Sequence, residues 1–287
     1  MHDLPYCPSI LREALQEALA VSWTIAVPNV APISIARQAA PILVKALRDS
    51  GTNEVLDMCS GGGGPFETFA SLEELNPPVV NAFILTDLYP NLASFKAMSD
   101  RHPTPGRLLY AAEPVDATAC DYGRKQQTQS NAVCYLRTMC ASMHHMSEDV
   151  LERILADVVA KQDGFLALEI TSRSVASMCI LPLGSPLLAC IAFLYHGRGQ
   201  KDLSSWWQRF VLTFIIPVIP VMFLVDGLIS CLRTYTKEEF LAIARKADPE
   251  GLYIWTAEER FLEGVYIPLT NYMGVPRKRQ VIPLSGS

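Results

Sequence analysis

The chain has 287 residues, half of them hydrophobic, and a formal net charge of −5. This composition allows one large buried core and excludes a disordered chain, and the weakly acidic balance offers no basic surface for nucleic acid. The eight cysteines form no CxxC pair, and the first twenty residues lack the basic head and apolar run of a signal peptide. We therefore expect free thiols and a cytoplasmic protein.

Two helices are expected first, because apolar residues recur at three-to-four spacing from Leu11 onwards and again over 33–51, where Gly51 supplies a C-cap. Short apolar runs bounded by turn residues then predict strands at 54–59, 81–88, 107–114, 132–139 and 165–172. Helix-like stretches such as 147–164 lie between the strands. This alternation predicts an α/β fold, doubly wound around a mostly parallel sheet.

Four consecutive glycines, Gly61 to Gly64, follow the first strand. Such a turn lets a ligand approach the backbone, although a flexible strand-to-helix loop is the plainer interpretation. Asp87 ends the second strand, where a carboxylate can accept both hydroxyls of a ribose, and Asp116 follows the third strand, where it could bind the amine of an adenine. Three such features in order favour a nucleotide-like ligand.

On these residues, the segment from about Gly51 to Ser174 resembles the class I S-adenosylmethionine-dependent methyltransferase family. The resemblance implies a seven-stranded sheet that ends in an antiparallel strand near 266–277, and S-adenosylmethionine as cofactor. The residues that carry it, and that would bind the cofactor, are Asp57, Gly61, Gly63, Asp87, Asp116 and Ala117.

The resemblance also implies a division of roles. Asp87 would hold the ribose, Asp116 the adenine, and the turn from Asp57 to Gly63 the methionine half. This chain departs from the family at Cys59, where the family has a glycine. Cys59 therefore weakens the resemblance in the part of the turn that would bind the methionine half of the cofactor.

The adjacent His144 and His145 follow the fourth strand, at the sheet edge where open α/β folds bind ligands. Either imidazole could remove a proton from a substrate hydroxyl or carboxyl, or the pair could only shape the pocket wall. Adjacent side chains point apart and no further ligand completes a set, so we expect no metal site. Glu169, at the end of the fifth strand, would contact the substrate or pair with Arg173.

The segment after the fifth strand is unusually apolar. Ser174 to Tyr195 carries no charge, and Phe210 to Val225 is equally apolar, so we expect a helical insertion at about 174–235. Prolines in both runs oppose membrane spanning. A lid or pocket wall for a hydrophobic substrate is favoured; the alternatives are peripheral contact with an intracellular membrane and a spanning hairpin. Arg233, seven residues after Asp226, would form a buried ion pair with it or anchor a substrate carboxylate.

These observations predict an N-terminal helical lid at 1–50 and a methyltransferase-like domain at 51–287. The leading function is S-adenosylmethionine-dependent methylation of a small hydrophobic substrate, such as a secondary metabolite. A rival is a methyltransferase fold recruited as a cyclase or pericyclase in natural-product biosynthesis, with no methyl transferred. Cys59 and the apolar insertion are compatible with the cyclase. A noncatalytic membrane-associated binding protein is the third alternative.

Overall fold

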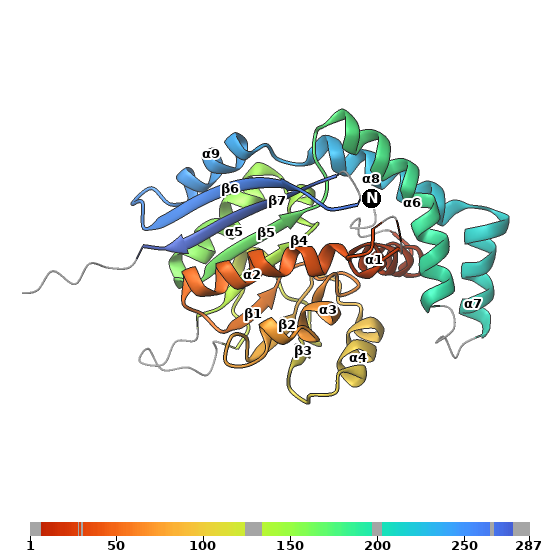
Figure 1. The fold of residues 1–287 in the computed structure, drawn as a ribbon, viewed down its shortest axis with the longest axis horizontal. Coiled ribbons are helices and arrows are strands. Elements are labelled where there is room, and N and C mark those ends of the chain that lie inside the picture. The colour runs from red at the N-terminus through yellow and green to blue at the C-terminus, as the bar shows by residue number, and fades with distance from the viewer. Residues whose placement is uncertain are drawn as a thin grey trace, which may run out of the picture.

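The computed structural model describes residues 7–27, 29, 31–123, 134–196, 203–264 and 267–277. A twisted sheet lies at the centre with helices on both faces, and a helical arm projects from one end (Figure 1). The arm corresponds to the expected apolar insertion after the fifth strand, together with the first helix of the chain.

Seven strands form one sheet in the order β3-β2-β1-β4-β5-β7-β6. Pairing is parallel from β3 through β5, whereas β7 runs antiparallel to both β5 and β6. The expected doubly wound, mostly parallel sheet with a late antiparallel strand is confirmed; residues 132 and 133 of the fourth expected strand lie outside the described residues. The strands are β1 (Glu54–Asp57), β2 (Ala82–Leu85), β3 (Leu108–Tyr110), β4 (Leu136–Cys140), β5 (Gly164–Glu169), β6 (Tyr253–Phe261) and β7 (Pro268–Pro276).

Each face of the sheet has its own hydrophobic core. On one face α2, α3 and α4 pack around Leu43, Phe66 and Phe95, and on the other α5 and α9 pack around Leu155 and Phe240. The helices are α2 (Ile35–Ser50), α3 (Phe66–Ala70), α4 (Leu92–Arg101), α5 (Glu148–Lys161) and α9 (Lys237–Ala247), with short 3-10 turns η1 (Glu73–Leu75), η2 (Ala117–Ala119) and η4 (Met143–His145).

Local sequence signals fix several helix ends. Gly51 ends α2 with a left-handed φ of 71°, as expected of a C-cap glycine. At the start of α9, Thr236 accepts from the backbone N–H of Glu239 while the Glu239 carboxylate accepts from the backbone N–H of Thr236. Short-range chemistry therefore sets these boundaries.

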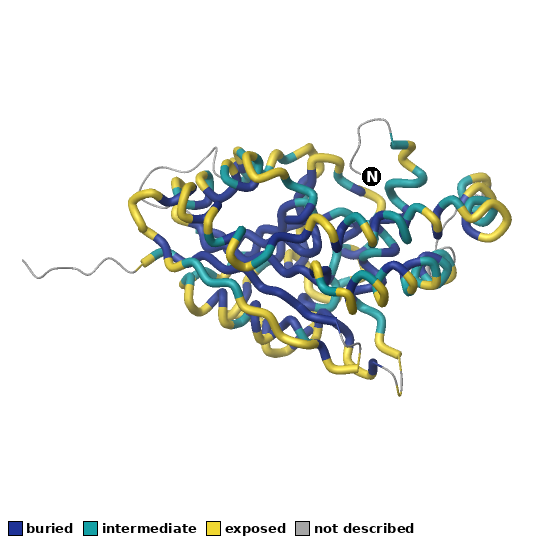
Figure 2. The backbone as a smooth tube through the Cα atoms, turned by 90° about the horizontal axis from the view of Figure 1, so that it is seen from above, coloured by how far each residue is buried: buried dark blue, intermediate teal, exposed yellow. Residues whose placement is uncertain are grey.

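The arm has a third hydrophobic core. Leu15 and Ala18 of the first helix pack against Ala189, Ile219 and Phe223 of the insertion. In Figure 2 the strands are mostly buried, whereas the arm is largely half-buried or exposed. The arm comprises α1 (Ser9–Thr24), α6 (Val175–His196), α7 (Leu203–Phe210), the π-helical turn η5 (Val211–Ile215) and α8 (Val218–Arg233).

Candidate functional site

The glycine turn after β1 is closed by neighbouring helices. A Cβ atom on Gly62 would lie 2.5 Å from the backbone oxygen of Gln16 in α1, and one on Gly63 would lie 2.0 Å from the Met98 side chain. Cys59 adopts a left-handed φ of 59°, at a cost of about 1 kcal/mol. The packing of α1 and α4 therefore accounts for two of the four glycines without a ligand.

Two carboxyl groups support this turn. Asp87 accepts from the backbone N–H of Gly61 at 2.7 Å and from that of Tyr89 at 2.8 Å. Asp57 is buried, and its Oδ1 accepts from the Thr138 hydroxyl at 2.7 Å. Burial is the main cause that raises the pKa of Asp57 to about 8, and the charge of Asp87 adds to it. Asp57 is thus mostly neutral at pH 7.

Asp116 lies beside an open cavity of about 520 Å³. Its Oδ1 accepts from the backbone N–H and the hydroxyl of Thr118, both at 2.8 Å, so the carboxylate caps η2. Val115 and Tyr122 also line this cavity, whereas Ala117 packs against the core under α5. The cavity has the size of ligand sites, which are roughly 300–1,000 Å³.

A second group of polar residues lies across the sheet edge, after β4 and β5. Glu169 is fully buried, and its Oε2 lies 2.8 Å from Nδ1 of His144. Its Oε1 accepts from the backbone N–H groups of Met143 and His144, at 2.8 and 3.3 Å. Because a carboxylate can only accept, Nδ1 is the donor, and a neutral ring keeps its lone pair on Nε2.

The Nε2 atom of His144 is buried and has no hydrogen-bond partner among the described residues. His144 is 3% exposed and lines a cavity of about 70 Å³ between η4, α1, α6 and α8. A buried imidazole lone pair beside an apolar cavity is suited to accept a proton. The lining is mainly apolar, with a few polar groups, and includes Leu15, Leu19, Leu181, Leu188, Phe223, Thr171, Ser185, Asp226 and Ser230.

His145 lies against its neighbour, with ring centroids 4.3 Å apart, and it lines the same cavity. Arg233 is exposed, and its Nη2 donates to the backbone oxygen of His145 at 2.7 Å. The expected buried pair between Asp226 and Arg233 is therefore wrong, because the α8 terminus turns the guanidinium outwards to the histidine loop. Arg233 supports the loop from outside the cavity.

The alternative pairing of Glu169 with Arg173 is also wrong. Arg173 instead bonds Glu239 at 2.8 Å, on the exposed side of the molecule. The buried Glu169 carboxylate contacts the backbone N–H groups of Met143 and His144, the His144 ring and the Thr171 hydroxyl. Glu169 would therefore act on a substrate through the ring of His144.

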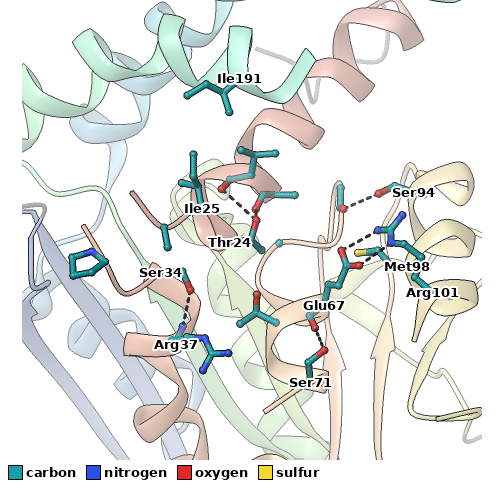
Figure 3. A pocket seen from close by; sticks show the side chains of 17 residues that line it. Thr24, Ile25, Ser34, Arg37, Glu67, Ser71, Ser94, Met98, Arg101 and Ile191 are labelled. Atoms are coloured by element: carbon teal, nitrogen blue, oxygen red, sulfur yellow. Dashed lines mark hydrogen bonds and ion pairs between the residues drawn. The ribbon is translucent and has the colours of Figure 1, made fainter. Parts of the chain in front are cut away.

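A larger cavity, of about 540 Å³, lies beside α1, α2, α3 and α4 (Figure 3). There Glu67 and Arg101 point toward each other and form two hydrogen bonds, at 2.8 and 2.9 Å. Ser94 donates to the backbone oxygen of Gly62 at its edge. Neither histidine lines this cavity, and its polar ion pair is solvated, so it is a poor match for an apolar substrate.

Sequence reasoning missed Ala141 as a site residue. It has a left-handed φ of 51°, lines the small cavity and begins the loop that carries both histidines. Asp226 and Ser230 were visible as polar interruptions of an apolar run, but nothing in the sequence placed them beside His144. Within the described ranges, no group of three or more His, Cys, Asp or Glu residues could hold a metal.

No family model and no curated protein matches the sequence. One similar solved structure is the methyltransferase domain of bacterial CtHen1, with a TM-score of 0.46 and 10% identity over 83% of this chain and 97% of that one. Human N-acetylserotonin methyltransferase in complex with SAM gives a TM-score of 0.41 and 10% identity, over 83% and 52% of the two chains. The [4+2]-cyclase SpnF gives 0.44 and 13%, over 94% of each chain.

These likenesses concern the fold alone, and their TM-scores below 0.5 say nothing about chemistry. The strand order, the parallel β1 to β5 and the antiparallel β7 match the sheet that the sequence resemblance implied. The chain has a class I methyltransferase-like fold.

Proposed function

We propose that this protein is an enzyme that uses S-adenosylmethionine to methylate a hydroxyl or carboxyl group of a small hydrophobic substrate. One observation carries the proposal: Nδ1 of His144 lies 2.8 Å from Oε2 of Glu169, Nε2 is buried without a partner among the described residues, and the residue lines an apolar cavity. Buried polar atoms are normally satisfied, so we assign this nitrogen to a ligand.

The chain's own residues perform the proton transfer. A substrate oxygen in the cavity donates its proton to Nε2 of His144, which becomes more positive as the oxygen becomes more nucleophilic. The Glu169 carboxylate fixes the ring through Nδ1 and stabilises the charge that develops on it. The apolar walls exclude water and strengthen this interaction. A positioned base of this kind contributes roughly 10²- to 10⁴-fold to the rate.

The residues around β1 to β3 fit the adenosine half of the cofactor. The Asp87 carboxylate, fixed by two backbone amides, would accept from the ribose, and Asp116 would bind the adenine at its 520 Å³ cavity. The turn at Gly61 and Gly63 would hold the methionine half. When bound, S-adenosylmethionine supplies an electrophilic methyl group on a positively charged sulfur.

The 70 Å³ cavity is smaller than the roughly 300 Å³ that small-molecule sites usually need. A substrate of more than a few heavy atoms therefore requires α6 and α8 to move away from α1. The contacts between these helices are mainly those of apolar side chains, which can slide at low cost compared with a buried polar network.

The test is incubation of the purified protein with S-adenosylmethionine carrying a deuterated methyl group and an apolar extract of the producing cells. Mass spectrometry should show a product in which one trideuteromethyl group has replaced a hydrogen atom of its precursor. The product should form roughly a hundredfold to ten-thousandfold more slowly with the His144→Ala variant. Extracts that give no labelled product with the folded wild-type protein would contradict methyl transfer.

A cyclase is the second candidate, and the geometry of the glycine turn favours it. Cys59 replaces the family's glycine, and α1 packs directly on Gly62, which narrows the methionine side of the site. In a cyclase, His144 would orient or polarise a folded substrate without removing a methyl group from the cofactor. Turnover would then persist with the demethylated cofactor, and product and substrate would have the same mass.

A further inference from the structure

The α6 helix buries small and polar residues, while several of its large apolar residues project outwards. Ser177, Ser185, Ala189 and Ala192 are buried. Leu183 and Leu187 are 76% and 65% exposed, and Ile180 and Leu194 also project outwards. In a protein surrounded by water, the opposite arrangement is the rule. Small residues inside and large apolar residues outside are typical of helices that face lipid.

The η5 and α8 segment repeats this arrangement. Asp226 and Ser230 are buried toward α6, and a Cβ atom on Gly227 would lie 3.0 Å from the Ser185 hydroxyl, so the helices approach closely. Large apolar side chains again project outwards. With those of α6 they form an outer apolar face, made of Ile180, Leu183, Leu187, Leu194, Ile215, Ile216, Val221, Leu228 and Leu232.

Hydropathy distinguishes this face from an ordinary protein contact. Val175–Leu194 has a mean hydropathy of 2.0 and is long enough to cross a membrane, yet only 28% of its most apolar window is buried. The sequence has no charged residue in this range. Interfaces between protein subunits have a polar rim, and α6 offers none along this length. Hydrocarbon is therefore a better match for the face than a second copy of the chain.

The inner side of the arm limits how it can enter a membrane. Arg209 of α7 forms ion pairs with Glu17 at 2.6 Å and with Glu13 at 3.1 Å. The charged side of α1 therefore faces α7 within the arm. Hydrocarbon cannot surround these charges on all sides without a large cost. The helices Ser204–Ile215 and Val218–Arg233 are also bent by 66° relative to each other, which suits a shallow path better than a straight span.

An aromatic cluster marks one end of the arm. Trp206, Trp207, Phe210 and Phe214 are packed with neighbouring ring centroids 5.3 to 5.5 Å apart. Trp207 is 53% exposed. Tryptophan is enriched where a membrane meets water.

We infer that the outer apolar face inserts into one leaflet of a lipid bilayer, with the arm lying along the membrane surface. The cavity at His144 lies on the opposite side of the same helices, because Leu181 and Ser185 line it while Leu183 and Leu187 point outwards. Resting on the proposed function, the substrate class follows: a lipid-soluble molecule taken from that leaflet.

Flotation with neutral phosphatidylcholine vesicles tests the insertion. The wild-type chain should float, with little sensitivity to salt, because the contact is apolar and not ionic. A Leu183→Ser, Leu187→Ser, Ile215→Ser variant should float at least about tenfold less, since three large apolar side chains are lost from the contact. Wild-type protein that stays at the bottom of the gradient would overturn the inference.

A matched control carries the same change at exposed apolar residues outside the arm, namely Leu109, Leu252 and Phe261. It should float like wild type, and both variants should retain the wild-type circular dichroism spectrum. Equal loss of flotation in the control and the arm variant would also overturn the inference, since the effect would not belong to the arm.

Brominated phosphatidylcholine gives a second measurement. It should quench the fluorescence of the wild-type chain, and Trp207→Phe should remove a large part of the quenching. A sedimenting dimer that dissociates in the arm variant, together with unquenched tryptophan, would assign the face to a second copy and overturn the inference. None of these measurements needs turnover or S-adenosylmethionine, so their failure is distinguishable from failure of the proposed function.

Discussion

The two sides of the strand edge use similar groups in different ways. Beside β1 and β2, the Asp87 carboxylate is occupied by the backbone N–H groups of Gly61 and Tyr89. Beside β4 and β5, Glu169 also accepts from backbone N–H groups, but it binds a histidine ring whose second nitrogen has no partner among the described residues. Under the proposed function, the first side would hold the cofactor and the second would accept a proton from the substrate.

The largest effect on turnover should come from His144, beside β4 and β5. His144→Ala should lower kcat by roughly a hundredfold to ten-thousandfold, because it removes the base, while the dissociation constant of S-adenosylmethionine changes little. His145→Ala is the matched control and should cost less than about tenfold. Labelled-methyl turnover and isothermal titration measure the two quantities. A larger loss of kcat in His145→Ala than in His144→Ala would assign the base to His145 instead.

Glu169 should matter next, as a positioning residue. Glu169→Gln keeps the size of the side chain but replaces one acceptor oxygen with an N–H₂ group, so the ring and the backbone donors are no longer all satisfied. We expect kcat to fall about tenfold to a hundredfold with KM nearly unchanged, since the ring's orientation matters in the transition state. A rise in KM at constant kcat would instead make Glu169 a substrate-binding group.

A change beside β1 and β2 should alter the affinity for S-adenosylmethionine. Asp87→Ala should weaken S-adenosylmethionine binding by at least about tenfold, because the carboxylate would accept from the ribose and also holds the glycine turn. Asp100→Ala removes an equal charge from the exposed surface of α4 and should leave affinity unchanged. Isothermal titration distinguishes them. Wild-type protein that binds neither the cofactor nor its demethylated product would remove the cofactor from the proposal.

Asp57 should affect stability and not turnover. The folded protein keeps its proton up to a pKa of about 8, whereas an unfolded carboxyl group loses it near pH 4. The free energy of unfolding should therefore fall as pH rises between about 4 and about 8, by at most about 1.4 kcal/mol per pH unit, and then level off. Asp57→Asn, which stays neutral, should lack this slope. Urea unfolding at several pH values measures it, and parallel slopes in the two proteins would contradict the burial argument.

Much of the fold was predictable because its signals are local. Short apolar runs, the Gly51 cap and the Thr236 capping box depend on neighbours within a few residues, and the alternation of strands and helices leaves few topologies. The glycine turn was harder, since the need for Gly62 comes from the backbone of Gln16, 46 positions earlier in the chain. No local pattern records such a contact.

The candidate site was only partly predictable for the same reason. The sequence identified His144 and Glu169 separately, but their hydrogen bond depends on the register of β4 and β5, which sequence periodicity does not set. It also suggested a pair between Asp226 and Arg233 from helical spacing, where the end of α8 turns the arginine outwards. Distant contacts and helix ends decide such details.

Nitrogen-15 nuclear magnetic resonance of the histidine rings near neutral pH measures which nitrogen of His144 carries the proton. We expect the proton on Nδ1 and a lone pair on Nε2, and we expect Glu169→Gln to disturb this tautomer while the signals of His102 stay unchanged. A His144 ring protonated on Nε2, or on both nitrogens, would present no basic atom to the apolar cavity and would contradict the role of His144 as the base.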